Sequence, residues 1–200
     1  MAKLYFKFGA MGSSKTAQAL MTKFNYEEKD KTVWLMKPSI DTRETEVTSR
    51  VGLHAPAYII SPAENLIDTY RRDYRKIDVI IVDECQFLTE EQVDQLRVFV
   101  DEYGIPVLCF GLRADFQAKL FPGSKRLFEI ADSITEIKSI CSCGRKAIVN
   151  VRFDDSGEII TEGDQVCIGG NDRYVGMCYK CYTERKKAHE AKLKMEQLTK

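Results

Sequence analysis

The sequence predicts an α/β protein in which helices flank a mostly parallel sheet, followed by a small cysteine-bearing domain. Short apolar runs alternate with helical patterns, a glycine-rich turn follows the first run, and two close cysteine pairs lie near the C-terminus. The 200 residues, 44% of them hydrophobic, are enough for one good core and an appendage. We expect domains over residues 1–138 and 139–182, and a charged helix or tail over residues 183–200.

The first apolar run, residues 4–8, leads into a glycine-rich turn and then into a helical pattern that opens at Lys15. This order is typical of a P-loop, in which backbone N–H groups and the helix dipole bind phosphate, a lysine adds charge and a hydroxyl ligates Mg²⁺. An ordinary strand, turn and helix with a surface lysine is the alternative. Ser14 stands where the usual G-x-x-x-x-G-K-[ST] pattern has a glycine, so we expect weaker nucleotide binding. The predicted phosphate-binding residues are Gly9, Ala10, Met11, Gly12, Ser13, Ser14, Lys15 and Thr16.

The later elements fit one P-loop NTPase-like sheet. Apolar runs predict strands at residues 32–36, 58–60, 79–82 and 105–110, and a further strand near 133–138 completes the layer. Helices are predicted to begin at Pro62, after the cap Thr89, and at about Ser124. Residues 39–56 lose periodicity and are predicted to form a polar loop.

Two acids, Asp83 and Glu84, directly follow the buried run at residues 79–82. Ligands of open α/β sheets bind at the carboxyl ends of the strands, so we expect Asp83 to face the glycine-rich turn. In that position it resembles a Walker B carboxylate, which holds Mg²⁺ directly or through water. An acidic loop with no metal is the alternative, and the pairing with the turn favours the metal.

Charge and hydropathy restrict the partners. Thirty basic and thirty acidic residues cancel, so no overall field predicts binding to nucleic acid. No apolar run reaches the roughly 18 residues of a membrane span, and the N-terminus lacks the long apolar stretch of a signal peptide. We therefore expect no membrane partner and a cytoplasmic location.

The seven cysteines of such a chain are expected to be reduced thiols or metal ligands. Cys141 with Cys143, and Cys178 with Cys181, form two pairs that predict a closed, structural zinc site in a zinc-ribbon-like domain. Cys85, Cys109 and Cys167 occur singly and are expected to be core residues. A hairpin is predicted between the pairs, with strands around residues 147–153 and 158–160.

Three segments resemble the cytosolic-type, zinc-containing thymidine kinase family. They are Asp83-Glu84-Cys85-Gln86-Phe87, the run from Phe110 to Phe116 (FGLRADF), and the run from Ile168 to Tyr174 (IGGNDRY) just before Cys178. The resemblance extends from about Leu4 to Cys181.

This resemblance implies ATP and Mg²⁺ as cofactors, thymidine as substrate, and Glu84 as the general base that draws the proton from the 5′-hydroxyl. Asp83, Glu84, Cys85 and Gln86 would join the phosphate loop in nucleotide binding. An apolar slot for the base would be formed by Met11, Phe87, Leu112, Phe116 and Phe121. A lasso loop of Gln165, Val166, Cys167, Ile168 and Gly169 would read its polar edge, with Tyr174 at the sugar or closing the lasso.

The resemblance further implies zinc on the four paired cysteines, a homotetramer, and inhibition by deoxythymidine triphosphate. Arg43 is a candidate for stabilising charge on the transferring phosphoryl group. A nucleic-acid-binding P-loop ATPase with a zinc ribbon is the alternative function, supported by the lysine-rich tail but opposed by the neutral charge. A structural zinc protein with an inactive nucleotide fold, suggested by Ser14, is a third reading.

Overall fold

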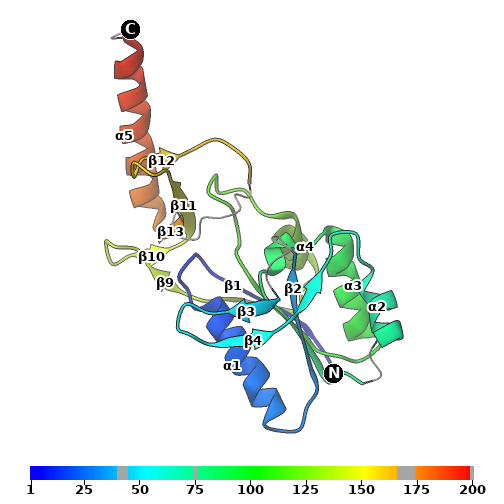
Figure 1. Cartoon of the computed structure of the whole chain (residues 1–200). Helices are drawn as coiled ribbons and strands as arrows, with labels where there is room; N and C mark the ends of the chain where they lie inside the picture. The colour runs from blue at the N-terminus through cyan, green and yellow to red at the C-terminus, as the bar shows by residue number, and fades with distance from the viewer. Residues whose placement is uncertain (40–44, 74–75, 166–173, 199–200) are drawn as a thin grey trace. The chain divides into compact units, whose positions relative to one another are not determined.

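The computed structural model describes the chain except residues 40–44, 74–75, 166–173 and 199–200, and the side chains of residues 196 and 197 (Figure 1). The chain divides into two compact units. The first unit comprises Met1–Gly9, Ser14–Arg113 and Leu120–Ile137. The second comprises Ala10–Ser13, Ala114–Lys119 and the described part of Lys138–Lys200.

A six-stranded sheet forms the centre of the first unit, with the strand order β5-β2-β6-β7-β1-β8. Every pairing in it is parallel, which confirms the predicted parallel sheet. The strands are β1 (Leu4–Phe8), β2 (Val33–Pro38), β5 (Tyr58–Ile60), β6 (Val79–Val82), β7 (Val107–Gly111) and β8 (Ser133–Glu136) (Figure 1). Because β7 lies between β1 and β6, the glycine-rich turn and the paired acids follow strands that share one neighbour.

Helices cover both faces of this sheet. They are α1 (Lys15–Glu27), α2 (Leu66–Asp73), α3 (Glu90–Asp101) and α4 (Pro122–Ile130), with a short 3₁₀ helix, η1 (Cys85–Phe87). Side chains of α1 pack with Val79 and Ile81, whereas those of α2, α3 and α4 pack with Ile80 and Val82. Successive residues of β6 therefore serve opposite faces, and a strand buried on both faces must be apolar throughout.

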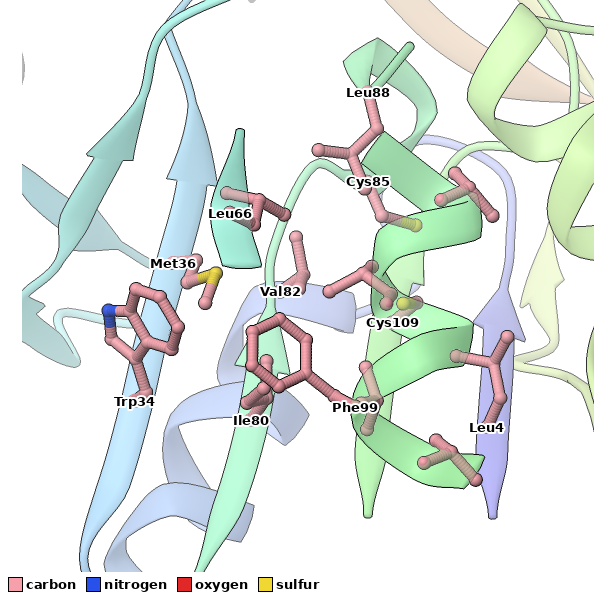
Figure 2. Close-up of a cluster of buried hydrophobic side chains, with 14 of the residues drawn as sticks. Leu4, Trp34, Met36, Leu66, Ile80, Val82, Cys85, Leu88, Phe99 and Cys109 are labelled. Carbon is pink, nitrogen blue, oxygen red and sulfur yellow. The ribbon is translucent and has the colours of Figure 1, made fainter. Parts of the chain in front are cut away.

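The larger core cluster lies on the face covered by α2, α3 and α4. Figure 2 shows Trp34 and Met36 of β2, Ile80 and Val82 of β6, and Phe99 of α3 pointing into one shared interior. The Phe99 ring meets Trp34 at a centroid distance of 6.0 Å and Tyr70 at 5.2 Å, both nearly edge-on.

Sequence periodicity missed a hairpin in the segment predicted to be a loop. Strands β3 (Glu46–Thr48) and β4 (His54–Pro56) pair antiparallel within residues 39–56, so the loop prediction was wrong there. Each strand has only three residues, and Val47 is the one residue of β3 that is fully buried. An alternation this short gives too weak a signal to predict a strand.

The helix expected from Pro62 begins instead at Leu66. The reason is Asn65, whose side-chain oxygen accepts the N–H groups of Ile67 and Asp68 and so caps the helix. The cap at Thr89 is confirmed: its hydroxyl accepts the Gln92 N–H, and the Gln92 side chain returns to the Thr89 N–H.

The second unit contains two small antiparallel sheets and a long helix. Strands β9 (Ser139–Ile140) and β10 (Lys146–Ala147) pair with each other, and β11 (Val149–Phe153) lies between β12 (Ile159–Ile160) and β13 (Tyr174–Met177). The pairing of β11 with β12 confirms the predicted hairpin. Helix α5 (Tyr179–Leu198) begins before residue 183 and so includes Cys181. No helix in the described part of the chain is long and apolar enough to cross a membrane.

We expect Phe99→Ala to lower the free energy of unfolding by about 3–5 kcal/mol, because it removes a fully buried ring from the larger core. Phe24→Ala is the matched control, since the Phe24 side chain is 60% exposed, and it should change stability by less than about 0.5 kcal/mol. Urea unfolding followed by circular dichroism measures both. Equal effects would contradict this core assignment.

Candidate active site and metal-ligating cysteines

The glycine-rich turn joins β1 to α1 through two left-handed residues. Gly12 has φ 74° and Ser14 has φ 60°. Ser14 is the N-cap of α1, and its carbonyl accepts the Gln18 N–H at 3.0 Å. A serine in this conformation costs roughly 1–2 kcal/mol that a glycine would avoid. Ser14 therefore keeps the left-handed conformation that the motif glycine would adopt before the helix, but with some backbone strain.

Lys15 opens α1 in a largely buried position, with 8% of its surface exposed. Burial lowers the pKa of Lys15, while attraction to the charges of Glu84 and Asp83 opposes that shift. A buried ammonium beside two carboxylates forms a charged cluster at the start of the helix. A bound anion would add to the groups that favour its charged form.

Asp83 follows β6 and is only 3% exposed. Its N–H donates to the Met36 carbonyl at 2.9 Å, and its carboxylate accepts a hydrogen bond from the Thr16 hydroxyl. Burial, followed by repulsion from Glu84, raises the pKa of Asp83 to about 7. Its Oδ1 atom is buried and has no hydrogen-bond partner among the described residues. An unpartnered carboxylate oxygen next to a threonine hydroxyl is a donor set that fits a divalent cation.

Glu84, the next residue, has a left-handed backbone, with φ 52°. The next residue starts η1, and Gln86 within it holds the Glu84 side chain: Gln86 Nε2 donates to Glu84 Oε2 at 2.5 Å. Gln86 Oε1 accepts the Leu112 N–H at 2.9 Å. A Cβ on Gly111 would lie 2.6 Å from Gln86 Oε1, so only glycine leaves room for this amide. Sequence reasoning placed Gln86 near the nucleotide but did not foresee its contact with Glu84.

Three of the residues predicted for the nucleoside slot belong to the first unit. The Phe87 and Phe121 rings meet edge-on at a centroid distance of 5.4 Å. Leu112 is buried, and its carbonyl accepts the Ser124 hydroxyl at 2.6 Å. Cys85, expected in the core, is fully buried there, and burial raises the pKa of its thiol.

The other described slot residues belong to the second unit. Arg152 lies over the rings of Phe116 and Tyr174, at 5.5 and 5.9 Å from their centroids. Gln165, the first residue of the predicted lasso, donates its side-chain amide to Asp115 Oδ2 at 2.8 Å. The remaining lasso residues, Val166, Cys167, Ile168 and Gly169, lie outside the described residues, as does Arg43.

The four paired cysteines form one cluster. The sulfur atoms of Cys141, Cys143, Cys178 and Cys181 all lie within 4.8 Å of one another. The Cys143 and Cys178 sulfurs are 3.6 Å apart, close to the roughly 3.8 Å expected for two thiolates on one tetrahedral ion with bonds of about 2.3 Å. Backbone N–H groups of residues 143 and 178 lower the pKa of Cys141 to about 6, which favours its thiolate. The donor set therefore fits a closed four-thiolate metal site.

Sequence reasoning missed two buried polar residues of the second unit, Asp115 and Asn150, which bond to predicted site residues. Asp115 Oδ1 accepts the N–H groups of Gln117 and Lys119, while its Oδ2 accepts Gln165. Asn150 hydrogen-bonds Met11 and Ala114. A lone Asn in an alternating strand gives no signal, whereas Asp115 lies in the FGLRADF segment and could have been considered there.

A parallel sheet, a glycine-rich turn opening a helix on a buried lysine, and an acidic pair ending a central strand define a P-loop nucleotide-binding enzyme. Comparison with known proteins narrows this class. The family model described as thymidine kinase matches residues 2–182. The thymidine kinases of Aliivibrio fischeri, Shewanella oneidensis and Vibrio parahaemolyticus are 44%, 45% and 46% identical to it over 188 residues, or 92% of this chain and 98% of each relative.

The chain belongs to the thymidine kinase family. It is thus a kinase, and membership implies thymidine and ATP as substrates together with a divalent metal ion. This finding decides for the kinase over the nucleic-acid-binding ATPase considered from the sequence.

Asp83→Asn should change how the stability of the nucleotide-free, magnesium-free protein depends on pH. The pKa of Asp83 is raised to about 7 in the folded state, against about 3.9 when unfolded. The folded protein therefore binds more protons between these values, so this carboxyl lowers stability progressively as the pH rises through that window. We expect the stability of the variant relative to the parent to rise by up to about 4 kcal/mol between pH 4 and pH 8.

Urea unfolding between pH 4.5 and pH 8 measures the difference. Asp94→Asn is the control, because the Asp94 side chain is 49% exposed and pairs with Arg126 at the surface. It should show a small, nearly constant difference. A pH-independent effect of Asp83→Asn would contradict the raised pKa.

Proposed function

We propose that this enzyme transfers the γ-phosphate of ATP to the 5′-hydroxyl of thymidine, and of deoxyuridine, giving the monophosphate in pyrimidine deoxynucleotide salvage for DNA synthesis. The observation that carries the proposal is the group of Lys15, Thr16, Asp83 and Glu84 in the first unit. Phosphoryl transfer requires charge stabilisation on the phosphates and orientation of the attacking hydroxyl. One buried ammonium, one hydroxyl and two adjacent carboxylates would meet both requirements.

The nucleotide would be bound by the turn from Gly9 to Thr16. Backbone N–H groups and the N-terminus of α1 favour phosphate, and Lys15 adds its charge. Thr16 and the unpartnered Oδ1 of Asp83 would hold Mg²⁺. When bound, Mg²⁺ neutralises part of the triphosphate charge. Its presence would also favour the ionised form of Asp83, which burial alone disfavours.

Glu84 would accept the proton of the 5′-hydroxyl. Its carboxylate is only half-buried, so it has access to a substrate, and Gln86 fixes one of its oxygens. Asp83 is almost fully buried and bonded to Thr16, whereas Glu84 is half-buried and bonded to Gln86. Adjacent carboxylates could therefore have different tasks, one toward the metal and one toward the hydroxyl.

Nucleoside recognition is proposed from the family resemblance together with the contacts within each unit. Phe87, Leu112 and Phe121 provide apolar side chains in the first unit, and Phe116 and Tyr174 provide aromatic rings in the second. Asp115 anchors Gln165 at the start of the lasso. An anchored loop loses less conformational entropy when it binds a ligand.

The four cysteines would hold one structural zinc ion, since a closed thiolate set of this size suits Zn²⁺ and leaves no open position for catalysis. From the resemblance we further propose a homotetramer, feedback inhibition by deoxythymidine triphosphate, and a cytoplasmic location with no nucleic-acid or membrane partner. The reduced thiols needed for the zinc site agree with that compartment.

Glu84→Gln should retain MgATP binding but lower kcat by roughly two to four orders of magnitude, because an amide accepts no proton in the transition state. Glu91→Gln is the matched control, since Glu91 is exposed on α3, and its kcat should match that of the parent. Phosphorylation of radiolabelled thymidine measures turnover, and calorimetry measures MgATP binding. Near-normal turnover of Glu84→Gln would remove Glu84 from this role.

Metal content gives a separate prediction. Elemental analysis should find about one zinc per chain. Cys143→Ala should lower the zinc content. Cys109→Ala should leave it unchanged, because Cys109 lies in the larger core cluster of the first unit. Chelation should speed amide exchange in β9 and β13, next to Cys141 and Cys178, and leave β6 and β7 protected. Equal zinc in both variants, or protection unchanged by chelation, would contradict the site.

A further inference from the structure

The tip of the phosphate loop, Ala10–Ser13, packs within the second unit, against the strands that adjoin the cysteine cluster. Ser139 of β9 donates its hydroxyl to the Gly12 carbonyl at 3.4 Å. The loop closes on itself through the Ser13 N–H, which donates to the Ala10 carbonyl at 3.3 Å. Only Ile140 separates Ser139 from Cys141, so the tip contacts a strand that ends at the proposed metal site.

Asn150 makes the most specific contact with this tip. It lies on β11 and is 4% exposed. Its Oδ1 accepts the Met11 N–H at 2.8 Å, and its Nδ2 donates to the Ala114 carbonyl at 2.7 Å. The oxygen of the amide faces the Met11 N–H, and its nitrogen faces the Ala114 carbonyl. Only this orientation of the amide satisfies both backbone groups.

Gly176 limits the space beside the carbonyl group of Met11. It is opposite Asn150 in the pairing of β11 with β13, and a Cβ placed on it would lie 2.7 Å from the Met11 carbonyl oxygen. That oxygen belongs to the backbone and cannot rotate away as a side chain would. The Met11 main chain is thus held through its N–H by Asn150 and limited near its carbonyl by Gly176.

We propose that Asn150 is a positioning residue that sets the orientation of the Met11 peptide in the phosphate loop and thereby the affinity for MgATP. The inference rests on the proposed function, in which this loop binds the triphosphate. An N–H group that donates to Asn150 is unavailable to phosphate, so the remaining amides of the loop bind the anion from a backbone that this bond fixes. Without the bond the loop would lose more conformational freedom on binding.

The position needs an asparagine because both backbone partners must be satisfied at once. Ala114 precedes Asp115, which holds Gln165 of the lasso. The same amide therefore connects the phosphate loop to the segment that anchors the nucleoside loop. Removing it leaves two backbone groups unsatisfied in a buried environment.

The test measures the Kd of MgATP by calorimetry, on zinc-loaded full-length protein without thymidine, alongside urea stability. Asn150→Ala should raise Kd about tenfold. Asn150→Asp retains an oxygen for the Met11 N–H but loses the donor to the Ala114 carbonyl, so its Kd should lie between those of the parent and Asn150→Ala. Gly176→Ala, which displaces the Met11 carbonyl, should raise Kd as Asn150→Ala does.

Val151→Ala is the control for general loosening of the second unit. Val151 is fully buried next to Asn150 on β11, so its truncation should lower stability and leave Kd unchanged. The proposal is overturned if Asn150→Ala binds MgATP like the parent, if Asn150→Asp is no better than Asn150→Ala, or if Val151→Ala weakens binding equally.

A further variant distinguishes failure of this proposal from failure of the proposed triphosphate site. Lys15→Met should raise Kd at least about tenfold if the loop binds the triphosphate. An unchanged Kd in Lys15→Met would remove the triphosphate site and the role of Asn150 with it. Weak binding by Lys15→Met together with normal binding by Asn150→Ala would remove the role of Asn150 alone.

Discussion

Burial of one carboxylate, that of Asp83, is the constraint on which the first unit depends. A carboxylate that is 3% exposed is stable in its charged form only when opposite charge and hydrogen bonds surround it. Lys15 and Thr16 provide part of that environment, and one oxygen still lacks a partner among the described residues. A divalent cation held by this oxygen and Thr16, as proposed, would supply the charge that favours the ionised form.

The residues at the end of β7 are closely packed against η1. Glu84 has a left-handed backbone, and the side chain of Gln86 contacts both the Glu84 carboxylate and the Leu112 N–H. The absence of a side chain at Gly111 makes that reach possible. The orientation of the proposed base thus depends on a backbone group of the neighbouring strand rather than on the acid itself.

The parallel sheet and the acidic pair could be predicted because their signals are local. The apolar run of β6 and the Thr89–Gln92 capping box each lie within a few residues, and the cysteine pairs cluster by spacing. The contacts of Asn150 with Met11 and of Asp115 with Gln165 join residues 139 and 50 positions apart, and no local pattern encodes such pairs. The β3–β4 hairpin was missed for a different reason, since its strands are too short to show periodicity. Asn65 was overlooked as a cap because Pro62 offered an earlier helix start.

The placement of Ala10–Ser13 within the second unit bears on how such a chain can evolve or be dissected. The sheet and the cysteine-bearing unit are not modules that can be exchanged as cassettes, because four residues near the N-terminus find their partners on strands near the other end of the sequence. A chain cut after Ile137 would retain every strand of the large sheet while leaving that tetrapeptide without its scaffold. Fragments and chimaeras of this enzyme therefore have to preserve both ends together.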